Sequence, residues 1–480
     1  MTEQGAIAGG GHRADAEDGP DAVSGGASSR AGAAEGGTGA GPGQARRRIG
    51  TREAARRLGV KPATLYAYVS RGLLGSSRAP GGRGSTFDPE EVAALARRGR
   101  AGTGAAGTER AAGDAVGAGG GWGRVRTGIT LIEPDRYSFR GVDAVSLATA
   151  YGYEEVALWL WTGVLRPGTR FTAPPGPLAA ARAAAAALPP TGGPMDRLRV
   201  AVPAAAAADP LRFDLSPDAV RATARGLVAT LVDALPPAAG PGSASEEPPP
   251  AEAPDPAAGE RLARRLWTRL AAEPACEAGL RVLDSALTLL IDHDLAASTL
   301  AARVAASARA HPYAVVSAGL GALDGPLHGQ ASALAHRTLT AVAERGEAGP
   351  VVAELLRSGQ RIPGLGHRLY RGEDPRATAL FALLEQDPAA AAPLAAARDL
   401  AATASARHPE LHPNVDLALA VLTVAHGMPA EAGEAVFAVA RTAGWIAHAM
   451  EEYGERPLRM RPVGAYDGPP PGQPLPQTPA

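Results

Sequence analysis

The sequence has almost no cysteine and almost no lysine. Its 480 residues include one cysteine, Cys276, and one lysine, Lys61, so that arginine carries nearly all of the positive charge. A single cysteine cannot form an intramolecular disulfide, and no Cys/His spacing typical of a zinc site occurs, so we expect neither a disulfide nor a bound metal. This cysteine usage favours a reducing, cytoplasmic setting.

The sequence also lacks long hydrophobic runs and a large net charge. No apolar stretch approaches the roughly 18 to 20 residues that a membrane helix needs. The N-terminal segment carries Asp15, Glu17, Asp18 and Asp21 instead of the apolar core of a signal peptide. The net charge is -1, so the chain as a whole attracts neither nucleic acid nor an anionic membrane. We therefore expect no membrane partner, and any basic surface must be local.

Composition divides the chain into segments. Single hydrophobic cores seldom exceed roughly 250 to 300 residues, so this length predicts two or three domains. Stretches rich in Gly, Ala, Ser and Pro that lack hydrophobic periodicity predict disorder or linkers. The predicted segments are a disordered tail (1–45), a small basic domain (46–100), a flexible linker (101–121), a large domain (122–468) with a Pro-rich acidic loop at 236–260, and a second disordered tail (469–480).

The large domain reads as mostly helical. Apolar residues recur at three- and four-residue intervals in segments such as RLARRLWTRLA (261–271), RVLDSALTLLIDHD (281–294) and EAVFAVARTAGWIAHAM (434–450). Strand-like alternation is nearly absent. We therefore predict a mainly all-α fold for this domain.

The small basic domain has twelve Arg and one Lys against four acidic residues. Its run TREAARRLGVKPATLYAYVSRGLL predicts a helix, a tight turn at Gly59 and a second helix, with one small core. A glycine-rich basic hairpin and a third helix from about Asp88 follow. The expected core residues are Ala55, Leu58, Val60, Leu65 and Val69. Together these features resemble the winged helix-turn-helix of MerR-type regulators.

This resemblance implies DNA binding through the second helix and the hairpin. In a helix-turn-helix the second helix enters the major groove, whereas basic residues of the wing contact phosphates. The alternative is an arginine-rich face that is merely solvated. The residues expected to contact DNA are Lys61, Thr64, Tyr66, Tyr68 and Arg71 on the helix and Arg78 and Arg83 on the wing.

The histidines are unevenly distributed, because nine of the ten lie between His293 and His448. GPLHGQ places His328 between glycines at a helix start, where free backbone amides favour an anion. PGLGHRLYRGEDPR places His367 after a Gly/Pro turn and before three arginines. HPNVD places Asp416 after a Pro-Asn turn that leads into an apolar helix. These three segments are candidates for a catalytic site.

The order and spacing of these motifs closely resemble the citrate synthase family. The resemblance covers GPLHG, PGLGHR with DPRA nine residues on, PNVD, RTAGWIAH, a C-terminal RP and the upstream TGITLIEPDRYSFRGVDAVSLATAYGYEEVALWLWTG, from about Thr127 to Tyr466. It implies the citrate synthase fold, with a large and a small helical domain, the latter at about 329–425. It also implies an enzyme that needs no cofactor and condenses acetyl-CoA, as a substrate, with oxaloacetate.

The resemblance also implies the roles of individual residues. Asp416 is the expected base, His328 the donor to the thioester carbonyl, and His367 the hydrogen-bonding partner of the keto oxygen. Planar guanidinium groups suit the two carboxylates of oxaloacetate. The expected substrate-binding residues are His293, Arg376, Arg441 and Arg461, with Arg461 supplied by the partner subunit of a homodimer. CoA is expected at Arg371 and along the backbone that ends at Leu365 and Gly366.

Alternatives remain at this point. Asp416 has a structural reading as an ordinary helix N-cap. His336, His412, His426 and His448 carry no catalytic signal and read as structural or exposed. The chain departs from the family pattern at Ala296, at 330–333 and at 417–420, where residues that orient the catalytic groups are expected. A 2-methylcitrate synthase that uses propionyl-CoA, or a DNA-binding regulator that senses metabolites through the same fold, are the competing interpretations.

Overall fold

The computed structural model separates the chain into two compact units, residues 1–118 and residues 119–480. The residues that it describes are 49–58, 65, 69, 74–78, 85–93, 125–238, 259–325, 328–462, 466–471 and 475. The predicted tail at 1–45 and the predicted linker at 101–121 lie outside this set, as do residues 239–258 of the Pro-rich loop.

The first unit contains a short helix and a small antiparallel sheet. Helix α1 (Thr51–Leu58) follows strand β1 (Ile49–Gly50), and the predicted hairpin is formed by β2 (Ser76–Arg78) and β3 (Ser85–Phe87). The sheet order is β1-β3-β2, so the N-terminal strand, which the sequence did not predict, extends the hairpin. The core of this unit surrounds Leu65 and consists of fully or nearly fully buried side chains, namely Ala54, Ala55, Leu74, Phe87 and Val92. Leu58 and Val69 pack against them as expected, whereas Val60 lies outside the described residues.

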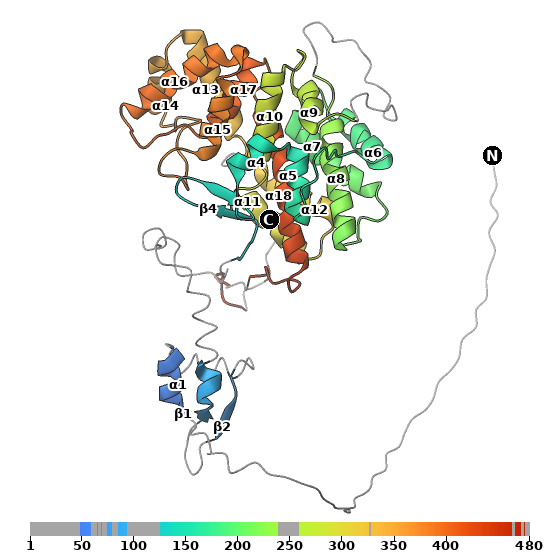
Figure 1. The fold of residues 1–480 in the computed structure, drawn as a ribbon, viewed down its shortest axis with the longest axis vertical. Helices are drawn as coiled ribbons and strands as arrows, with labels where there is room; N and C mark the ends of the chain where they lie inside the picture. The colour runs from blue at the N-terminus through green and yellow to red at the C-terminus, as the bar shows by residue number, and fades with distance from the viewer. Residues whose placement is uncertain are drawn as a thin grey trace, which may run out of the picture. The chain divides into compact units, whose positions relative to one another are not determined.

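The second unit is predominantly helical, in agreement with the predicted fold class (Figure 1). It opens with a small antiparallel sheet made of β4 (Thr130–Ile132), β5 (Tyr137–Phe139) and β6 (Val142–Asp143). The helices that follow up to the middle of the unit are α4 (Ala144–Ala150), α5 (Tyr153–Thr162), α6 (Pro175–Ala186), α7 (Pro194–Ala207), α8 (Pro217–Asp233), α9 (Leu262–Leu270), α10 (Glu277–Leu289), α11 (Ala297–Ser307) and α12 (Pro312–Leu323). The remaining elements are α13 (Ala331–Arg345), α14 (Gly349–Arg357), α15 (Pro375–Leu384), η1 (Pro388–Ala390), α16 (Ala391–Ser405), α17 (Val415–Ala425) and α18 (Ala432–Tyr453).

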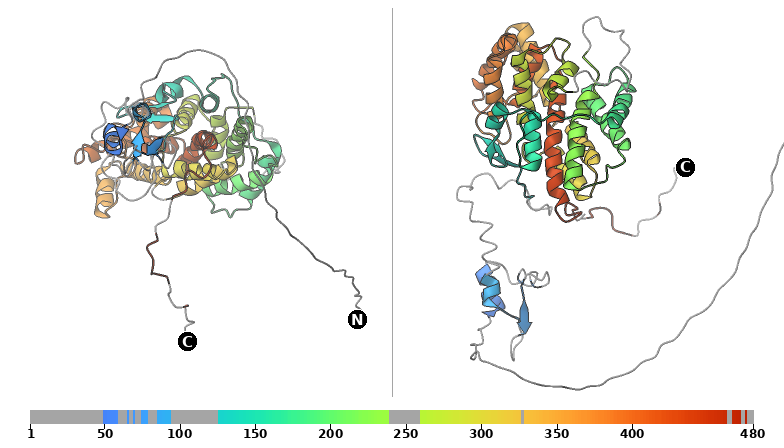
Figure 2. Two further views of the ribbon diagram at one scale, coloured as in Figure 1. Left: turned by 90° about the horizontal axis from the view of Figure 1, so that it is seen from below. Right: turned by 45° about the vertical axis from the view of Figure 1, so that its right-hand side comes forward.

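Helix α18 runs through the middle of this unit (Figure 2). It packs against α5, α7, α8, α10, α11, α12, α13 and α17. A helix buried on nearly every side must be apolar all round and must carry small residues where its neighbours come close. At Gly444 a Cβ would lie 2.1 Å from the carbonyl oxygen of Ile291, so glycine allows α18 to reach the loop after α10. The segment RTAGWIAH therefore fixes the position of that loop.

Helices α13 to α17 form a group that packs mainly on itself. Its closest pairs are α13 with α17, α13 with α16, and α15 with α17. The group meets the other helices through contacts of α15 and α17 with α10, of α13 and α17 with α18, and of α15 with α4. Figure 1 shows it at one end of the helical unit. It spans the residues expected for the smaller subdomain. Among the described helices, none is long and apolar enough to cross a membrane.

Candidate active site

The loop between α10 and α11 carries His293. This side chain is 7% exposed, and its Nε2 atom lies 2.7 Å from the hydroxyl oxygen of Tyr370. Tyr137 packs edge-on against the imidazole, with ring centroids 5.5 Å apart. Burial, together with the charges of Arg376 and Arg441, holds the pKa of His293 well below its ordinary value. The imidazole is therefore neutral at pH 7.

His367 lies in the loop before α15, with its ring centroid 5.2 Å from that of His293. The backbone N–H groups of Leu369 and Tyr370 donate to its Nδ1 atom over 3.0 and 3.4 Å. Its Nε2 atom lies 3.1 Å from Nη2 of Arg376. Burial, reinforced by that guanidinium, lowers the pKa of His367 to about 4. His367 is therefore also a neutral imidazole at pH 7.

The hydrogen bonds of His367 indicate which ring nitrogen carries the proton. They also leave its contact with Arg376 without an acceptor. Because two N–H groups donate to Nδ1, the ring proton belongs on Nε2. That N–H then faces the guanidinium of Arg376, which has donors and no acceptor. Both donors are satisfied when one acceptor oxygen lies beside the pair, within hydrogen-bond distance of each nitrogen.

Arg376 is 3% exposed and is held by Asp374, the N-cap residue of α15. Its Nε and Nη2 atoms donate to the two carboxylate oxygens of Asp374 over 2.9 and 2.8 Å. Asp374 also accepts the N–H of Val415 over 3.1 Å, which ties the start of α15 to the start of α17. Despite its burial, the carboxylate has a pKa below its ordinary value because Arg376 stabilises the charged form. The guanidinium is thus fixed in place before any ligand arrives.

A short backbone pairing brings the His367 loop beside α17. The N–H of Gly366 donates to the carbonyl of His412 over 2.7 Å, and that of Asn414 donates to Gly364 over 3.0 Å. Asn414 is the N-cap of α17, and its side chain accepts the N–H of Asp416 over 3.0 Å. The structural reading of Asp416 as the N-cap is therefore wrong, since Asn414 fills that role and leaves the Asp416 carboxylate available.

Among the residues that the structure describes, the carboxylate of Asp416 has one side-chain partner, the hydroxyl of Ser332 on α13, which donates to Oδ1 over 2.6 Å. Burial raises the pKa of Asp416 above its ordinary value, and this hydrogen bond and the charge of Arg376 act in the opposite direction. A carboxylate with a raised pKa is a stronger base than one in water. Ser332 lies within the segment 330–333 in which the chain departs from the expected pattern.

His328 lies just before α13 and contacts two further helices. Its Nε2 atom is 2.8 Å from the hydroxyl of Ser298 on α11, and its ring packs edge-on against Phe437 of α18 at 6.2 Å. Burial and the charge of Arg441 lower its pKa below the ordinary value. His328 is thus a third neutral imidazole.

Arg441 is the second buried arginine of the site, with 1% of its side chain exposed. Its Nε atom donates to the carbonyl of Leu290 over 2.9 Å, and its guanidinium lies 4.5 Å above the ring centroid of Phe437. Burial lowers its pKa to about 10, so it remains a cation at pH 7. Its field lowers the pKa of both His293 and His328, while that of Arg376 acts on His293, His367 and Asp416. The two arginines therefore link all of these groups electrostatically.

Of the other expected site residues, two are exposed and two are held by backbone pairing. Arg371 and Arg461 are exposed, and the N–H of Arg461 donates to the carbonyl of Leu458 over 3.1 Å. Leu365 is buried and pairs with Pro413, beside the bonded backbone of Gly366. Of the residues expected to bind DNA, Arg78 belongs to strand β2. The others, Lys61, Thr64, Tyr66, Tyr68, Arg71 and Arg83, lie outside the described residues.

Several residues of the site were not predicted from the sequence. Ser298, Ser332, Tyr370 and Asp374 all contact a predicted site residue directly. The one local signal was the position of Ser332, which follows His328 by one helical turn. His448, read as structural or exposed, is fully buried and lies 3.2 Å from Asp292, the neighbour of His293.

Solved structures resemble the helical unit. Citrate synthase from Pyrobaculum aerophilum matches with a TM-score of 0.62 and 26% identity, covering 74% of this chain and 92% of that one. Citrate synthase from Thermotoga maritima matches with a TM-score of 0.56 and 26% identity, covering 74% and 97%. The fold is therefore that of citrate synthases.

The family models agree with the fold. The model of the citrate synthase C-terminal domain matches residues 120–463, and that of the MerR HTH family regulatory proteins matches residues 51–97. The chain therefore belongs to the citrate synthase family and carries a MerR-like module at its N-terminal side.

Curated relatives match over part of their length. "Putative citrate synthase 2" of Mycobacterium tuberculosis is 37% identical over 214 residues, which are 44% of this chain and 57% of that protein. The citrate synthase of Synechocystis sp. is 36% identical over 193 residues, covering 39% and 48%. The chain thus spans about half the length of the curated relatives that it matches.

Proposed function

We propose that the helical unit condenses acetyl-CoA with oxaloacetate and water to give citrate and CoA. The enzyme is then an acyltransferase that converts the acyl group into an alkyl group and needs no cofactor. The observation that carries the proposal is the pair of donors formed by Nε2 of His367 and Nη2 of Arg376, 3.1 Å apart. An oxygen of a dianionic keto acid that lies beside the pair, off the line joining the two nitrogens, accepts from both.

Asp416 is the proposed base. Removing a proton from the methyl group of a thioester produces an enolate that is far too basic for water, so a base and a donor to the thioester carbonyl must act together. Burial raises the pKa of Asp416, which makes its carboxylate a stronger base. Within the described part of the chain Ser332 bonds only Oδ1, which leaves the second carboxylate oxygen, Oδ2, for the substrate.

His328 is the proposed donor to the thioester carbonyl. When the hydroxyl of Ser298 donates to Nε2, the ring proton must lie on Nδ1, which is the proposed donor to the substrate. A neutral imidazole suits this role, because an imidazolium would protonate the enolate instead of sharing a hydrogen bond with it. Ser298 is thus proposed as the residue that fixes the tautomer.

Oxaloacetate is proposed to bind between His293, His367, Arg376 and Arg441. The two guanidinium groups are buried and already oriented by protein oxygens, so little side-chain entropy is lost on binding. In a homodimer Arg461 of one subunit would complete the neighbouring site, and its exposure is compatible with that role. Arg371 and the backbone at Leu365 and Gly366 are proposed to hold CoA.

Turnover of acetyl-CoA and oxaloacetate by the wild type and by Asp416→Ala tests this function. Loss of the base is expected to lower kcat by about 100- to 10,000-fold. An inactive wild type that still binds oxaloacetate would identify a metabolite-sensing regulator instead. Faster turnover of propionyl-CoA than of acetyl-CoA would identify a 2-methylcitrate synthase. The elution volume and mass of the protein in solution test the homodimer.

The MerR-like module is proposed to bind DNA. Support comes from the family match over residues 51–97 and from the hairpin strand β2, which carries Arg78. A gel shift with genomic fragments at increasing salt tests this proposal, because phosphate contacts weaken as salt rises. Absence of a gel shift at low salt would contradict DNA binding and would indicate a different partner for the module. The cytoplasmic setting stays a prediction that rests on the single cysteine.

A further inference from the structure

Three side chains from distant parts of the sequence converge at one end of α10. Cys276 is the N-cap of α10, Asp387 is the N-cap of η1, and His426 is the C-cap of α17. One ligand-type atom of each lies within 4.8 Å of the other two. His293 follows the opposite end of α10, and a helix of 13 residues is about 20 Å long. The cluster is therefore separate from the candidate active site.

Two of the three side chains form a fixed pair. Nε2 of His426 lies 2.8 Å from Oδ2 of Asp387, and the side chains are 10% and 1% exposed. The other carboxylate oxygen of Asp387 accepts the N–H of Ala389 over 3.1 Å, which orients the carboxylate. Trp267 packs edge-on against the imidazole, with ring centroids 4.6 Å apart.

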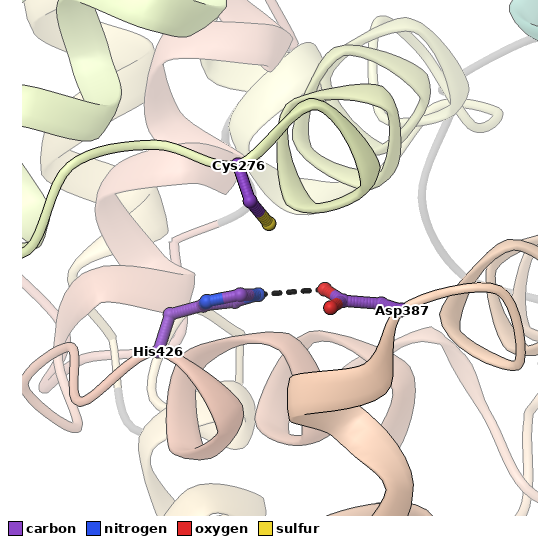
Figure 3. Close-up of side chains that lie close together, drawn as sticks. All are labelled: Cys276, Asp387 and His426. Atoms are coloured by element: carbon purple, nitrogen blue, oxygen red, sulfur yellow. Dashed lines mark hydrogen bonds and ion pairs between the residues drawn. The ribbon is translucent and has the colours of Figure 1, made fainter.

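Cys276 completes the cluster from the other side. Its sulfur accepts the N–H of Gly279 over 3.2 Å and points toward the His426–Asp387 pair (Figure 3). The absence of a side chain at Gly279 is required, because a Cβ there would lie 2.9 Å from Nε2 of His426 and 2.6 Å from Trp267. The first turn of α10 is thus shaped to let the imidazole approach the thiol.

An ordinary Asp–His hydrogen bond beside a surface cysteine is the simplest alternative, and a Cys-His-Asp catalytic arrangement is another. In the catalytic arrangement the thiol and the carboxylate use opposite nitrogens of the imidazole. Here the carboxylate takes Nε2, and the sulfur points toward the same side of the pair. Three ligand atoms that converge on one point, instead of forming a proton relay, suit a shared cation.

We propose that Cys276, Asp387 and His426 bind a divalent cation of the zinc class. Thiolate, imidazole and carboxylate are the ligands that zinc takes, at about 2.0 to 2.3 Å, whereas magnesium and calcium prefer oxygen alone. A tetrahedral ion with such bonds sets its ligand atoms about 3.3 to 3.8 Å apart. The Asp–His distance of 2.8 Å must therefore open slightly and the sulfur must move inward, within the present span of 4.8 Å. A thiolate and a carboxylate together neutralise the ion, and water at the exposed side supplies the fourth ligand.

The cation would connect α10 to the α13–α17 group. Cys276 belongs to α10, whereas Asp387 and His426 belong to segments of that group. The site would thus link two groups of helices. Binding of the cation should therefore raise the midpoint of thermal unfolding. This inference does not rest on the proposed enzymatic function.

Zinc titration of the full, untagged chain tests the proposal, with alkylation of the thiol as the second readout. Because Cys276 is the single cysteine of the chain, alkylation reports on this site alone. One zinc ion per chain is expected to slow alkylation, because the thiolate that would react is then bound to the metal. Cobalt in place of zinc is expected to show thiolate-to-cobalt charge-transfer absorption.

Substitutions distinguish this site from zinc bound to other histidines. Cys276→Ser keeps an N-cap oxygen for α10 and is expected to fold normally, yet it should weaken zinc binding by at least about tenfold, as should His426→Gln. The matched control is His408→Gln, which removes an exposed histidine that lies 3.5 Å from Glu410 and has no thiol nearby. Unchanged zinc affinity in Cys276→Ser, or alkylation that zinc does not slow, would overturn the proposal.

Discussion

The hydrogen bond from Ser332 to Asp416 should set the lower pH limit of catalysis. It is 2.6 Å long, and it holds the pKa of Asp416 down while burial raises it. The substitution Ser332→Ala removes the hydroxyl and leaves the helix intact, since alanine is the best helix former. The pKa of Asp416 should therefore rise further.

The size of this rise follows from the strength of a hydrogen bond to a charged group, about 1.5 to 3 kcal/mol. One pKa unit corresponds to about 1.4 kcal/mol, so the pKa of Asp416 should increase by about one to two units. Because the proposed base must be ionised, the acidic limb of kcat/KM should move upward by the same amount. Well above that limb the rate should change little, since the ionised base is then fully populated.

The assay is kcat/KM for acetyl-CoA as a function of pH, at saturating oxaloacetate. Thioester absorbance is the preferred signal, because a thiol reagent would also react with the exposed Cys276. Thr338→Ala serves as a control on the same helix, where the hydroxyl donates to the carbonyl of Leu334 over 2.8 Å and does not contact Asp416. An acidic limb that stays in place in Ser332→Ala, while the wild type is active, would refute the role of Asp416 as the base.

Three further predictions follow from other buried groups. Arg376→Lys should raise the KM for oxaloacetate roughly ten- to hundredfold, because lysine cannot form the bidentate contact; steady-state kinetics measures this. The pKa of His367 is lowered from 6.5 to about 4, so the neutral ring contributes stability that is present above pH 6.5 and lost as pH falls toward 4. For this partly exposed ring that is on the order of 2 kcal/mol, and urea unfolding of His367→Asn should show a flatter pH dependence over this range. Arg265→Met should lower the free energy of unfolding by about 3 to 5 kcal/mol, since it removes the fully buried partner that bonds Asp233 at 2.7 Å.

The helices could be predicted from the sequence because their signal is local. Apolar spacing marked α9 and α18 at nearly their observed positions, whereas the segment 281–294 runs past the end of α10 at Leu289; the turn residues of the small domain marked its hairpin. Four short strands were not predicted, namely β1, β4, β5 and β6, which span two or three residues each. Alternation over two or three residues carries no usable pattern, and these strands exist because neighbouring chain segments pair with them.

The site was predicted only in part. Motifs identified His293, His367 and Arg376, which the structure brings into contact or near contact. They did not identify Ser332, although it contacts the proposed base, because a serine in a helix is most often unremarkable. They also gave no reason to connect Cys276 with His426, which are 150 positions apart in the chain but converge at the end of α10.

The sequence by itself determined the helical class, the two-part organisation and the residue types of the active site, because periodicity and short motifs depend on neighbours along the chain. Tertiary structure decided which polar groups meet. The passage of α18 close to the loop before His293, the pairing of the 364–366 backbone with 412–414, and the approach of α13 to α17 each join segments that are distant in sequence. Burial at these junctions then sets the protonation of Asp416 and the histidines, since the cost of desolvating a charge depends on the completed packing.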